Sequence, residues 1–538
     1  MVGFGNCIPY RVFVASSVVG LLLGFVGCSA KDSPDNDSFQ NSTVTDGKPV
    51  HIPAGKETVV QVRNEDSEKT DTENDVSGLF DELAFKKWPV PDFALFITGR
   101  QYGFIEPCGC TGLDNQKGGL SRRHSLLNDV RQLGWPVFPL DMGNQVRRTG
   151  IQAEIKYHMT MEALRELKYE SIVYGPDDLR LTFEELLVEI YPDAEVSPLP
   201  YLSANVDLLD FIPRYQVKEV GGRRIGLTAV LGGSHHARVG GGEDILLTDP
   251  QESLDEVWPQ LESEDCDLYV LLAHASIEES QELARRFKGF SIVITAGGAG
   301  EPNYLPEPIE GTESVLIQVG TKGMYAGVLG FYGESQPRLR YQRIALDAKW
   351  KDSPQMIRLL ENYQHQLEGM GLKGLQLNPV AHWTGHEFVG TDQCGGCHEQ
   401  PHEIWLETGH SHATATLVRP PERKEVPRHF DPECLSCHVT GWNFQGHLPY
   451  ETGYVDLEAS AHLHGNGCEN CHGPGSAHVA AEQAEEVVDE DQLNKLREEM
   501  RLTLENAREF CMKCHDLDNS PDFGKEESFN RYWEEIAH

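Results

Sequence analysis

One pentapeptide, Cys-x-x-Cys-His, occurs four times in the last third of this 538-residue chain. Two thiols at this spacing can each add to one vinyl group of a haem, which gives two thioether bonds. The next residue is then close enough to place its imidazole on the haem iron. The cysteine pairs are Cys394 and Cys397, Cys434 and Cys437, Cys468 and Cys471, and Cys511 and Cys514. The repeat therefore predicts four covalently attached c-type haems.

Each copy of the motif also supplies one histidine to its own iron, and these are His398, His438, His472 and His515. The alternative is two zinc sites, each made of paired Cys-x-x-Cys units. Zinc explains the cysteine pairs but not a histidine after every second cysteine, so the sequence favours haem.

The sixth ligand of each haem iron then decides the function of that haem. A second histidine gives an electron-transfer haem, whereas an open position admits a small molecule.

The charge of the chain limits its partners. There are 84 Asp and Glu residues against 46 Lys and Arg, which gives a formal net charge of −38. Nucleic-acid binding requires a basic surface, so we expect no nucleic-acid partner. An acidic surface can steer a basic redox partner protein, although the same charge also serves solubility alone.

The first 28 residues have the features of a targeting segment. Arg11 precedes an apolar run at 12–27, which is too short for an ordinary transmembrane helix of about 20 residues. The run ends Phe25-Val26-Gly27-Cys28. This resembles the lipobox of bacterial lipoproteins, with Phe25 where Leu is usual, and implies a lipid anchor at Cys28. An ordinary signal peptide cut nearby is the alternative. Both place the mature protein in the periplasm or cell envelope, where c-type haem is attached.

Composition divides the remaining chain. Residues 29–90 are polar and cannot bury enough apolar surface to offset their ordering entropy, so we expect a disordered tether, with a short helix near 76–85. Residues 91–348 alternate strand and helix patterns and predict a layered α/β domain. Residues 349–387 form a helical linker, with apolar residues at helical spacing in 353–370.

The expected strands are 93–98, 136–141, 171–174, 201–206, 215–220, 224–231, 268–272, 291–295, 315–319, 326–331 and 339–344. The expected helices of the same region are 118–133, 152–167, 250–262 and 278–287. Alternating strands and helices followed by hairpins are typical of an α/β sandwich.

This order of elements resembles the metallophosphoesterase domain of the 5'-nucleotidase family. The matching stretches are Ile105-Glu106-Pro107, Gly118-Gly119-Leu120-Ser121-Arg122-Arg123, Leu140-Asp141-Met142-Gly143-Asn144 and Leu272-Ala273-His274. The resemblance implies two metal ions that clamp a phosphate and activate water. The chain departs from the family's ligand pattern at nearly every position, with Arg100 and Tyr102 in the first loop, Gly143-Asn144, Gly175-Pro176-Asp177 and Gly297-Gly298-Ala299-Gly300. Only His274 remains, so we expect the fold without the phosphatase activity.

Cys108-Gly109-Cys110 is a separate feature of the first loop of this domain. Two thiolates on a tight turn could bind an additional soft metal, with His274 or Asp177 as further ligands. They could instead form a disulfide, alone or with Cys266, or stay reduced and inert. The sequence leaves these alternatives open.

From residue 388 the chain resembles the cytochrome c-554 family. The resemblance rests on Phe388-Val389-Gly390-Thr391, on Trp405, Thr408 and His410, on Asp431-Pro432-Glu433, and on the run from Gly467 to His478. It implies a mainly α, loop-rich multihaem domain at 388–538 in which three irons have two histidine ligands and the fourth is undetermined. By family position the sixth ligands are His410, His478 and His538. His412 competes with His410, and His429 is a candidate for the fourth haem. We also expect a short helix after each motif and one long helix at 476–510.

These features predict an extracytoplasmic multihaem cytochrome that carries electrons, with a phosphoesterase-like domain that serves for docking. Two alternatives remain. One is a haem-based reductase of a small nitrogen or sulfur oxide at a five-coordinate haem. The other is a phosphoesterase with unusual metal ligands.

Overall fold

A computed structural model describes residues 83–107, 113–239, 244–423, 426–486, 488–516, 519–520 and 522–538. The predicted signal peptide, the lipid site at Cys28, the tether up to residue 82 and the pair Cys108 and Cys110 lie outside the described residues. Among the helices that are described, none combines the length and the apolar character needed to cross a bilayer.

The first sheet lies in the α/β region and has five strands in the order β13-β12-β1-β2-β3. Strand β1 pairs in parallel with β2 and antiparallel with β12. The bounds are β1 Phe93–Thr98, β2 Val137–Asp141, β3 Ser171–Ile172, β12 Tyr325–Phe331 and β13 Leu339–Ala345. Because β1, β2 and β3 are parallel, the loops after them gather at one edge of the sheet.

The second sheet has six strands in the order β10-β11-β9-β8-β6-β5. Its central strands β6, β8, β9 and β11 are parallel, with antiparallel strands at both edges. The bounds are β5 Tyr215–Val220, β6 Arg223–Leu231, β8 Leu268–His274, β9 Ile292–Thr295, β10 Glu307–Pro308 and β11 Val315–Gln318. A separate small pair joins β4 Val206–Leu208 to β7 Ile245–Leu247.

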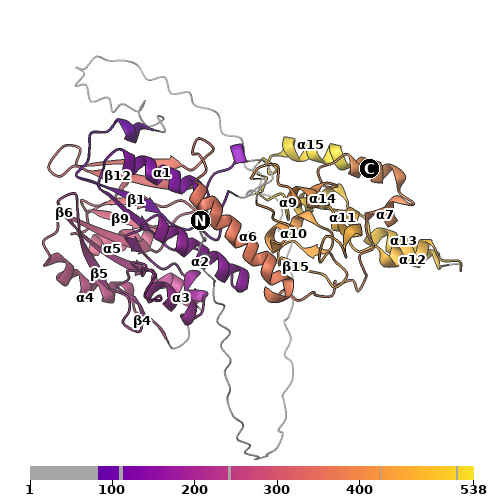
Figure 1. The fold of residues 1–538 in the computed structure, drawn as a ribbon, viewed down its shortest axis with the longest axis horizontal. Helices are drawn as coiled ribbons and strands as arrows, with labels where there is room; N and C mark the ends of the chain where they lie inside the picture. Colours follow the sequence, from indigo (N-terminus) through magenta and orange to yellow (C-terminus); the bar gives the residue numbers. More distant parts are fainter. Residues whose placement is uncertain are drawn as a thin grey trace, which may run out of the picture. The chain divides into compact units, whose positions relative to one another are not determined.

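The two sheets face each other across a fully apolar core (Figure 1). Phe93, Leu95 and Ile97 point from β1 into this core, and Leu227 and Leu272 meet them from the second sheet. Helices α1 Leu120–Gln132, α2 Ile151–Glu166 and α6 Pro354–Gly374 cover the outer face of the first sheet, and α4 Pro250–Glu262 and α5 Ile277–Arg286 cover the second. The α/β sandwich expected from the sequence is therefore present, as four layers.

One prediction for this region is wrong, and one helix was missed. Residues 201–205 do not form a strand, because the Asn205 side chain bonds to the backbone of Leu231 and Thr248 in place of a strand partner. Helix α3 Phe183–Ile190 was not predicted, although Thr182 caps its N-terminus in the usual way. The remaining short elements are the 3₁₀ helices η2 Ala84–Lys87, η3 Leu113–Asn115, η4 Asp178–Arg180 and η5 Gly233–Arg238.

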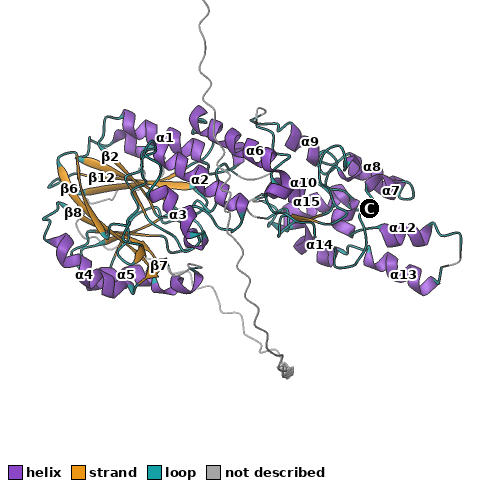
Figure 2. Cartoon of the chain, turned by 60° about the horizontal axis from the view of Figure 1, so that its bottom comes forward, coloured by secondary structure: helices purple, strands orange, loops and turns teal. Residues whose placement is uncertain are grey.

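The C-terminal region is mainly helical and rich in loops, as Figure 2 shows. Its helices are α7 Thr391–Gly395, α8 Glu399–Leu406, α9 Ala413–Val418, α10 Pro432–His438, α11 Cys468–His472, α12 Ser476–Glu482, α13 Glu490–Glu499, α14 Leu504–Cys511 and α15 Glu526–Ile536. The 3₁₀ helix η6 Ala461–Leu463 and the hairpin of β14 Trp442–Asn443 and β15 Leu448–Pro449 complete it.

Two predictions for the C-terminal region are also wrong. The single helix expected at 476–510 is three helices, α12, α13 and α14. Asp489 separates the first two, because its side chain accepts a hydrogen bond from the Gln492 amide and begins a new helix. The short helix expected after each motif is present after the first motif, as α8, and after the third, as α12, but after His438 the chain continues as the hairpin instead.

Candidate functional site

Each Cys-x-x-Cys-His motif lies on a helical turn of the C-terminal region. The His398 amide donates to the Cys394 carbonyl at 2.9 Å, and the His515 amide donates to the Cys511 carbonyl at 2.8 Å. Residues four apart on such a turn lie on the same face. The turn therefore presents the first cysteine and the histidine of a motif to the same side.

Hydrogen bonds fix the orientation of two motif imidazoles. Nδ1 of His438 lies 2.9 Å from the Ala413 carbonyl, and Nδ1 of His472 lies 2.6 Å from the Met500 carbonyl. A carbonyl only accepts, so Nδ1 carries the proton in both rings. Nε2 is then left as the nitrogen that can bind a metal. Nδ1 of His515 is similarly engaged, with the Ser520 hydroxyl at 2.8 Å.

Three motif histidines each face a second histidine from elsewhere in the chain. The ring centroids lie 6.4 Å apart for His398 and His478, 6.0 Å for His515 and His410, and 5.8 Å for His472 and His538. Two imidazoles that bind one metal from opposite faces, through bonds of about 2 Å each, place their centroids about 6 Å apart. The structure thus brings His478, His410 and His538 each beside a motif histidine, at a separation that fits a shared iron.

His438, in the second motif, differs from the other three. Within the residues that the structure describes, no ring contact joins it to another imidazole. His412 lies at the N-terminus of α9, and the buried Nδ1 of His429 has no hydrogen-bond partner. Neither of these two candidates faces a motif histidine in the described structure.

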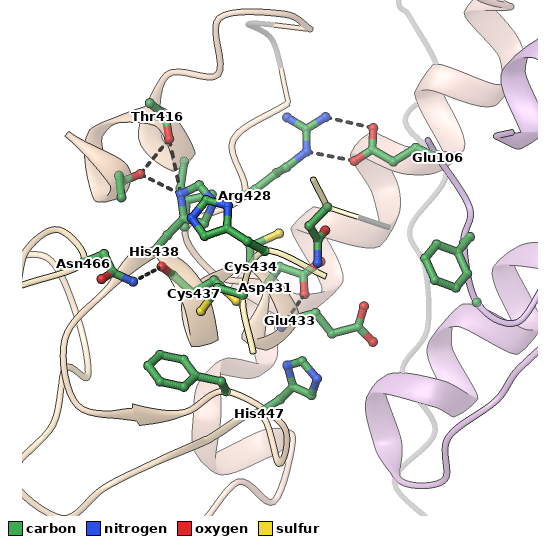
Figure 3. A pocket seen from close by; sticks show the side chains of 18 of the residues that line it. Glu106, Thr416, Arg428, Asp431, Glu433, Cys434, Cys437, His438, His447 and Asn466 are labelled. Carbon is green, nitrogen blue, oxygen red and sulfur yellow. Dashed lines mark hydrogen bonds and ion pairs between the residues drawn. The ribbon is translucent and has the colours of Figure 1, made fainter. Parts of the chain in front are cut away.

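A cavity of about 1200 Å³ connects three of the motifs. Figure 3 shows Cys434, Cys437 and His438 at this cavity, with His447 near the same cysteines. Its lining includes Cys471 and, from the fourth motif, Cys511, Cys514 and His515. Reduced cysteines and histidines around so large a space fit the attachment of haem groups, which would fill it. The haem would supply an iron that cycles between the ferrous and ferric states.

The cysteines also show which motifs are neighbours. The thiols of Cys394 and Cys468 are within hydrogen-bonding reach, as are those of Cys437 and Cys514. The Cys471 and Cys511 thiols are close enough to interact electrostatically. In space the motifs therefore follow the order first, third, fourth, second.

The second motif is also tied to the α/β region. Lys156 of α2 pairs with Glu433 at 2.6 Å, and Gln152 donates to Asp431 at 2.7 Å. Tyr363 and Gln364 of α6 donate to the same Asp431 carboxylate at 3.1 and 3.0 Å. Both carboxylates stand just before Cys434, so two helices of the α/β region hold the start of this motif.

Glu106 makes a second connection, from the loop after β1. It pairs with Arg428 at 2.8 Å and also with Arg423 (Figure 3). Burial alone would raise the pKa of the Glu106 carboxyl, but the two guanidinium groups outweigh it and lower the pKa below its usual value. The ion pair therefore persists at neutral pH.

The edge of the sheets where a two-metal phosphoesterase holds its ions has different chemistry here. Arg100 donates to the Gly298 carbonyl at 3.0 Å, and Arg238 pairs with Asp177 at 2.6 Å. His274 donates from Nδ1 to the Met142 carbonyl at 2.6 Å. Burial, and then His235, Arg100 and Arg238, lower the pKa of His274 to about 3. Guanidinium groups repel cations, so these residues do not fit a pair of metal ions. Across the described ranges no group of three His, Cys, Asp or Glu residues is placed to hold a metal.

The motifs, the imidazole pairs and the two sheets define a multidomain protein with a c-type cytochrome region and a phosphoesterase-like region. Residues 393–473 match the family Cytochrome c554 and c-prime. Cytochrome c-554 of Nitrosomonas europaea is 33% identical over 98 residues, which are 16% of this chain and 39% of that protein. The match to this family implies covalently bound c-type haem.

The N-terminal region is similar to 5'-nucleotidases. Snake venom 5'-nucleotidase of Crotalus adamanteus is 23% identical over 243 residues, which are 41% of each chain. The 5'-nucleotidase precursor of Thermus thermophilus superposes with a TM-score of 0.45 and 19% identity, over 54% of this chain and 60% of that one. The chain thus spans about two fifths of the length of the curated relatives described here.

Some residues of the site were not predicted from the sequence. No sequence motif includes Lys156, Gln152 or Arg428. Their contacts join segments that lie far apart in the chain. Glu106 and Glu433 were noted only as parts of family resemblances. Nothing in the local sequence indicates that either carboxylate connects two regions.

Proposed function

We propose that this protein is an extracytoplasmic electron carrier with four c-type haems. The observation that carries the proposal is the set of three imidazole pairs, each with centroids about 6 Å apart. Two histidines on one iron leave no position for a substrate and suit electron transfer. The similarity of residues 393–473 to cytochrome c554 supports the same conclusion.

Each cysteine pair would hold one haem by thioether bonds, and the motif histidines His398, His438, His472 and His515 would bind the irons. His478, His410 and His538 would be the sixth ligands of the first, fourth and third haems. The spatial order of the motifs supports a route for electrons from the first haem through the third and fourth to the second. Redox partner proteins would dock at the two ends of this route.

The α/β region would serve for docking and support instead of phosphoester hydrolysis. Arg100 stands in a loop where a phosphoesterase needs metal ligands, and Arg238 pairs with Asp177 of another such loop, which supports this role. The ties of Lys156 and Glu106 to the second motif support it further, because they join this region to one end of the electron route. A lipid on Cys28, in the periplasm or cell envelope, would tether the protein to the membrane.

Electron paramagnetic resonance of the mature holoprotein tests the proposal, together with a haem stain and iron analysis of the same sample. We expect four irons per chain and three low-spin ferric signals. A sample matured with the haem attachment machinery that holds no haem would refute the proposal, and so would one in which every signal is high-spin.

A second candidate function is the reduction of a small nitrogen or sulfur oxide at the second haem. It rests on His438, which faces no other imidazole in the described residues, and on the cavity beside it. In that case the same spectrum contains one high-spin ferric signal that shifts when nitrite or sulfite is added. Four low-spin signals that do not respond to either anion would exclude it.

A further inference from the structure

The α/β region forms one wall of the cavity at the second motif. This cavity of about 1200 Å³ is lined by Cys434, Cys437 and His438 of the motif. Lys156 of α2 and Gln364 of α6 line the same cavity. A haem attached to the two cysteines would occupy this space, so side chains of two α/β helices belong to its surroundings.

A close ion pair stands in this wall. Nζ of Lys156 lies 2.6 Å from the Glu433 carboxylate, and the lysine side chain is only 10% exposed. The next cation, Arg148, lies 3.9 Å from the same carboxylate and is 50% exposed. Burial would raise the pKa of the Glu433 carboxyl, but Lys156 outweighs burial and lowers the pKa below its usual value. Glu433 is therefore charged near pH 7, and it stands directly before Cys434 in the chain.

Neighbouring groups fix the position of this pair. Nζ of Lys156 lies 5.9 Å from the centre of the Tyr363 ring, and the Glu433 amide donates to the Asp431 carboxylate at 3.0 Å. Charges held in a poorly hydrated interior interact more strongly than charges in water, and salt screens them less. The pair can therefore act on an iron in the same cavity more strongly than surface charges do.

Two polar atoms of the same cavity lining have no hydrogen-bond partner among the described residues. Gln364 is 3% exposed and donates from Nε2 to Asp431 at 3.0 Å, but its Oε1 is buried without a donor. Nε2 of His447 is also buried and unpartnered, and this ring interacts electrostatically with both Lys156 and Glu433. Such atoms are rare in folded proteins, which indicates that the lining meets an occupant of the cavity.

We propose that Lys156 and Glu433 shift the reduction potential of the second haem in opposite directions, so that the α/β region tunes one end of the electron route. Ferrous iron carries one positive charge less than ferric iron. The Lys156 cation therefore favours the ferrous state and raises the potential, whereas the Glu433 anion lowers it. Both are positioning residues that act through space. The inference rests on the proposed attachment of a haem at the second motif.

A potentiometric titration of the full-length holoprotein, followed by the haem absorption band, tests the inference. We expect four one-electron waves. Lys156→Met should move one wave to lower potential, and Glu433→Gln should move the same wave to higher potential. Each change should alter the reduction equilibrium constant of that haem at least about threefold. The double variant should lie between the two single variants. His438→Met identifies the wave of the second haem, because methionine in place of an axial histidine raises the potential.

The matched control is Lys86→Met. Lys86 pairs with Asp129 at 2.7 Å, and it is not among the residues that line the cavity. It should leave all four waves unchanged. An unchanged haem content and unfolding midpoint show that a variant is folded, and Lys156→Gln replaces Lys156→Met if the latter does not fold.

Three results would overturn the inference and leave the proposed function intact, because all four haems would still be present. They are no shift in either variant, shifts of both variants in the same direction, and shifts confined to a wave that His438→Met does not move. A holoprotein without a haem at the second motif would refute the proposed function and, with it, this inference.

Discussion

At the scale of single residues, the imidazole pairs make the most direct prediction. Replacing His478 by alanine should remove the ring that faces His398 at 6.4 Å and open one iron. We expect one low-spin ferric signal of the holoprotein to become high-spin, with the haem content unchanged because the cysteines remain. Electron paramagnetic resonance measures this. His365→Ala on the exposed side of α6 is the control, and an identical change in both variants would contradict the assignment.

His158 makes a residue-scale prediction about stability. Burial would lower its pKa, but hydrogen bonds to Glu189 and Glu185 outweigh burial and raise the pKa above 6.5. Its stabilising effect is therefore complete below pH 6.5 and is lost as the pH rises through the folded-state pKa. The side chain is 36% exposed, so we expect His158→Gln to cost less than about 1 kcal/mol at pH 6. Thermal unfolding of both proteins at pH 6 and pH 9 checks this, since the difference must shrink at the higher pH.

The sequence predicted best those residues whose functional partners are only a few positions away in the chain. Cys434, Cys437 and His438 lie within five positions, so their spacing alone predicts haem attachment. His410, His478 and His538 were suggested by family position, and the structure places all three beside motif histidines. The pairing of Glu106 with Arg428 joins residues 322 positions apart. No local pattern encodes such a contact, because it depends on how whole regions pack.

At the scale of elements, α6 makes a prediction about packing. Leu367 is fully buried against the outer face of the first sheet together with Leu360. Leu367→Ala should destabilise the α/β region by about 2–5 kcal/mol, through lost burial and the cavity that remains. Urea unfolding followed by tryptophan fluorescence measures the loss. Gln366→Ala, one position away on the exposed side, should change stability by less than about 0.5 kcal/mol. Equal losses in the two variants would contradict this orientation of the helix.

Composition alone gave a wrong helix boundary in the C-terminal region. The run at 476–510 is rich in helix-forming residues, and its composition alone favours one long helix. The chain instead starts new helices after Asp489 and Thr503, which allows Met500 between them to accept the Nδ1 proton of His472. The strand Phe93–Thr98 was predicted correctly, because all six of its residues are buried and form one continuous apolar run. The edge strand Tyr215–Val220, which has no buried residue, was also predicted correctly. Tertiary contacts decide element boundaries wherever a cap or a ligand competes with propensity.

At the scale of the whole molecule, the ion pairs of Glu106 couple the α/β region to the second haem motif. The carboxyl pKa is lowered from 4.5, so its stabilising effect is present above pH 4.5 and is lost as the pH falls through the folded-state pKa. Glu106→Gln leaves Arg428 without its carboxylate, whereas Arg423 keeps Asp352 at 2.8 Å. We expect a loss on the order of 2 kcal/mol at pH 7, less than for a fully buried pair because Glu106 is 20% exposed.

Urea unfolding of the holoprotein, followed by the haem absorption band, measures this loss at pH 7 and again at a pH below 4.5, where the difference between the two proteins should shrink as Glu106 becomes protonated. Glu264→Gln is the matched control, since its pair with Arg224 at 3.0 Å lies within the α/β region and on the surface. It should leave the haem transition unchanged at both pH values. An equal loss of unfolding free energy from Glu106→Gln at both pH values would contradict this coupling. So would an equal shift of the urea midpoint of the haem transition in Glu264→Gln, because then the Glu106 ion pairs do not connect the stability of the two regions.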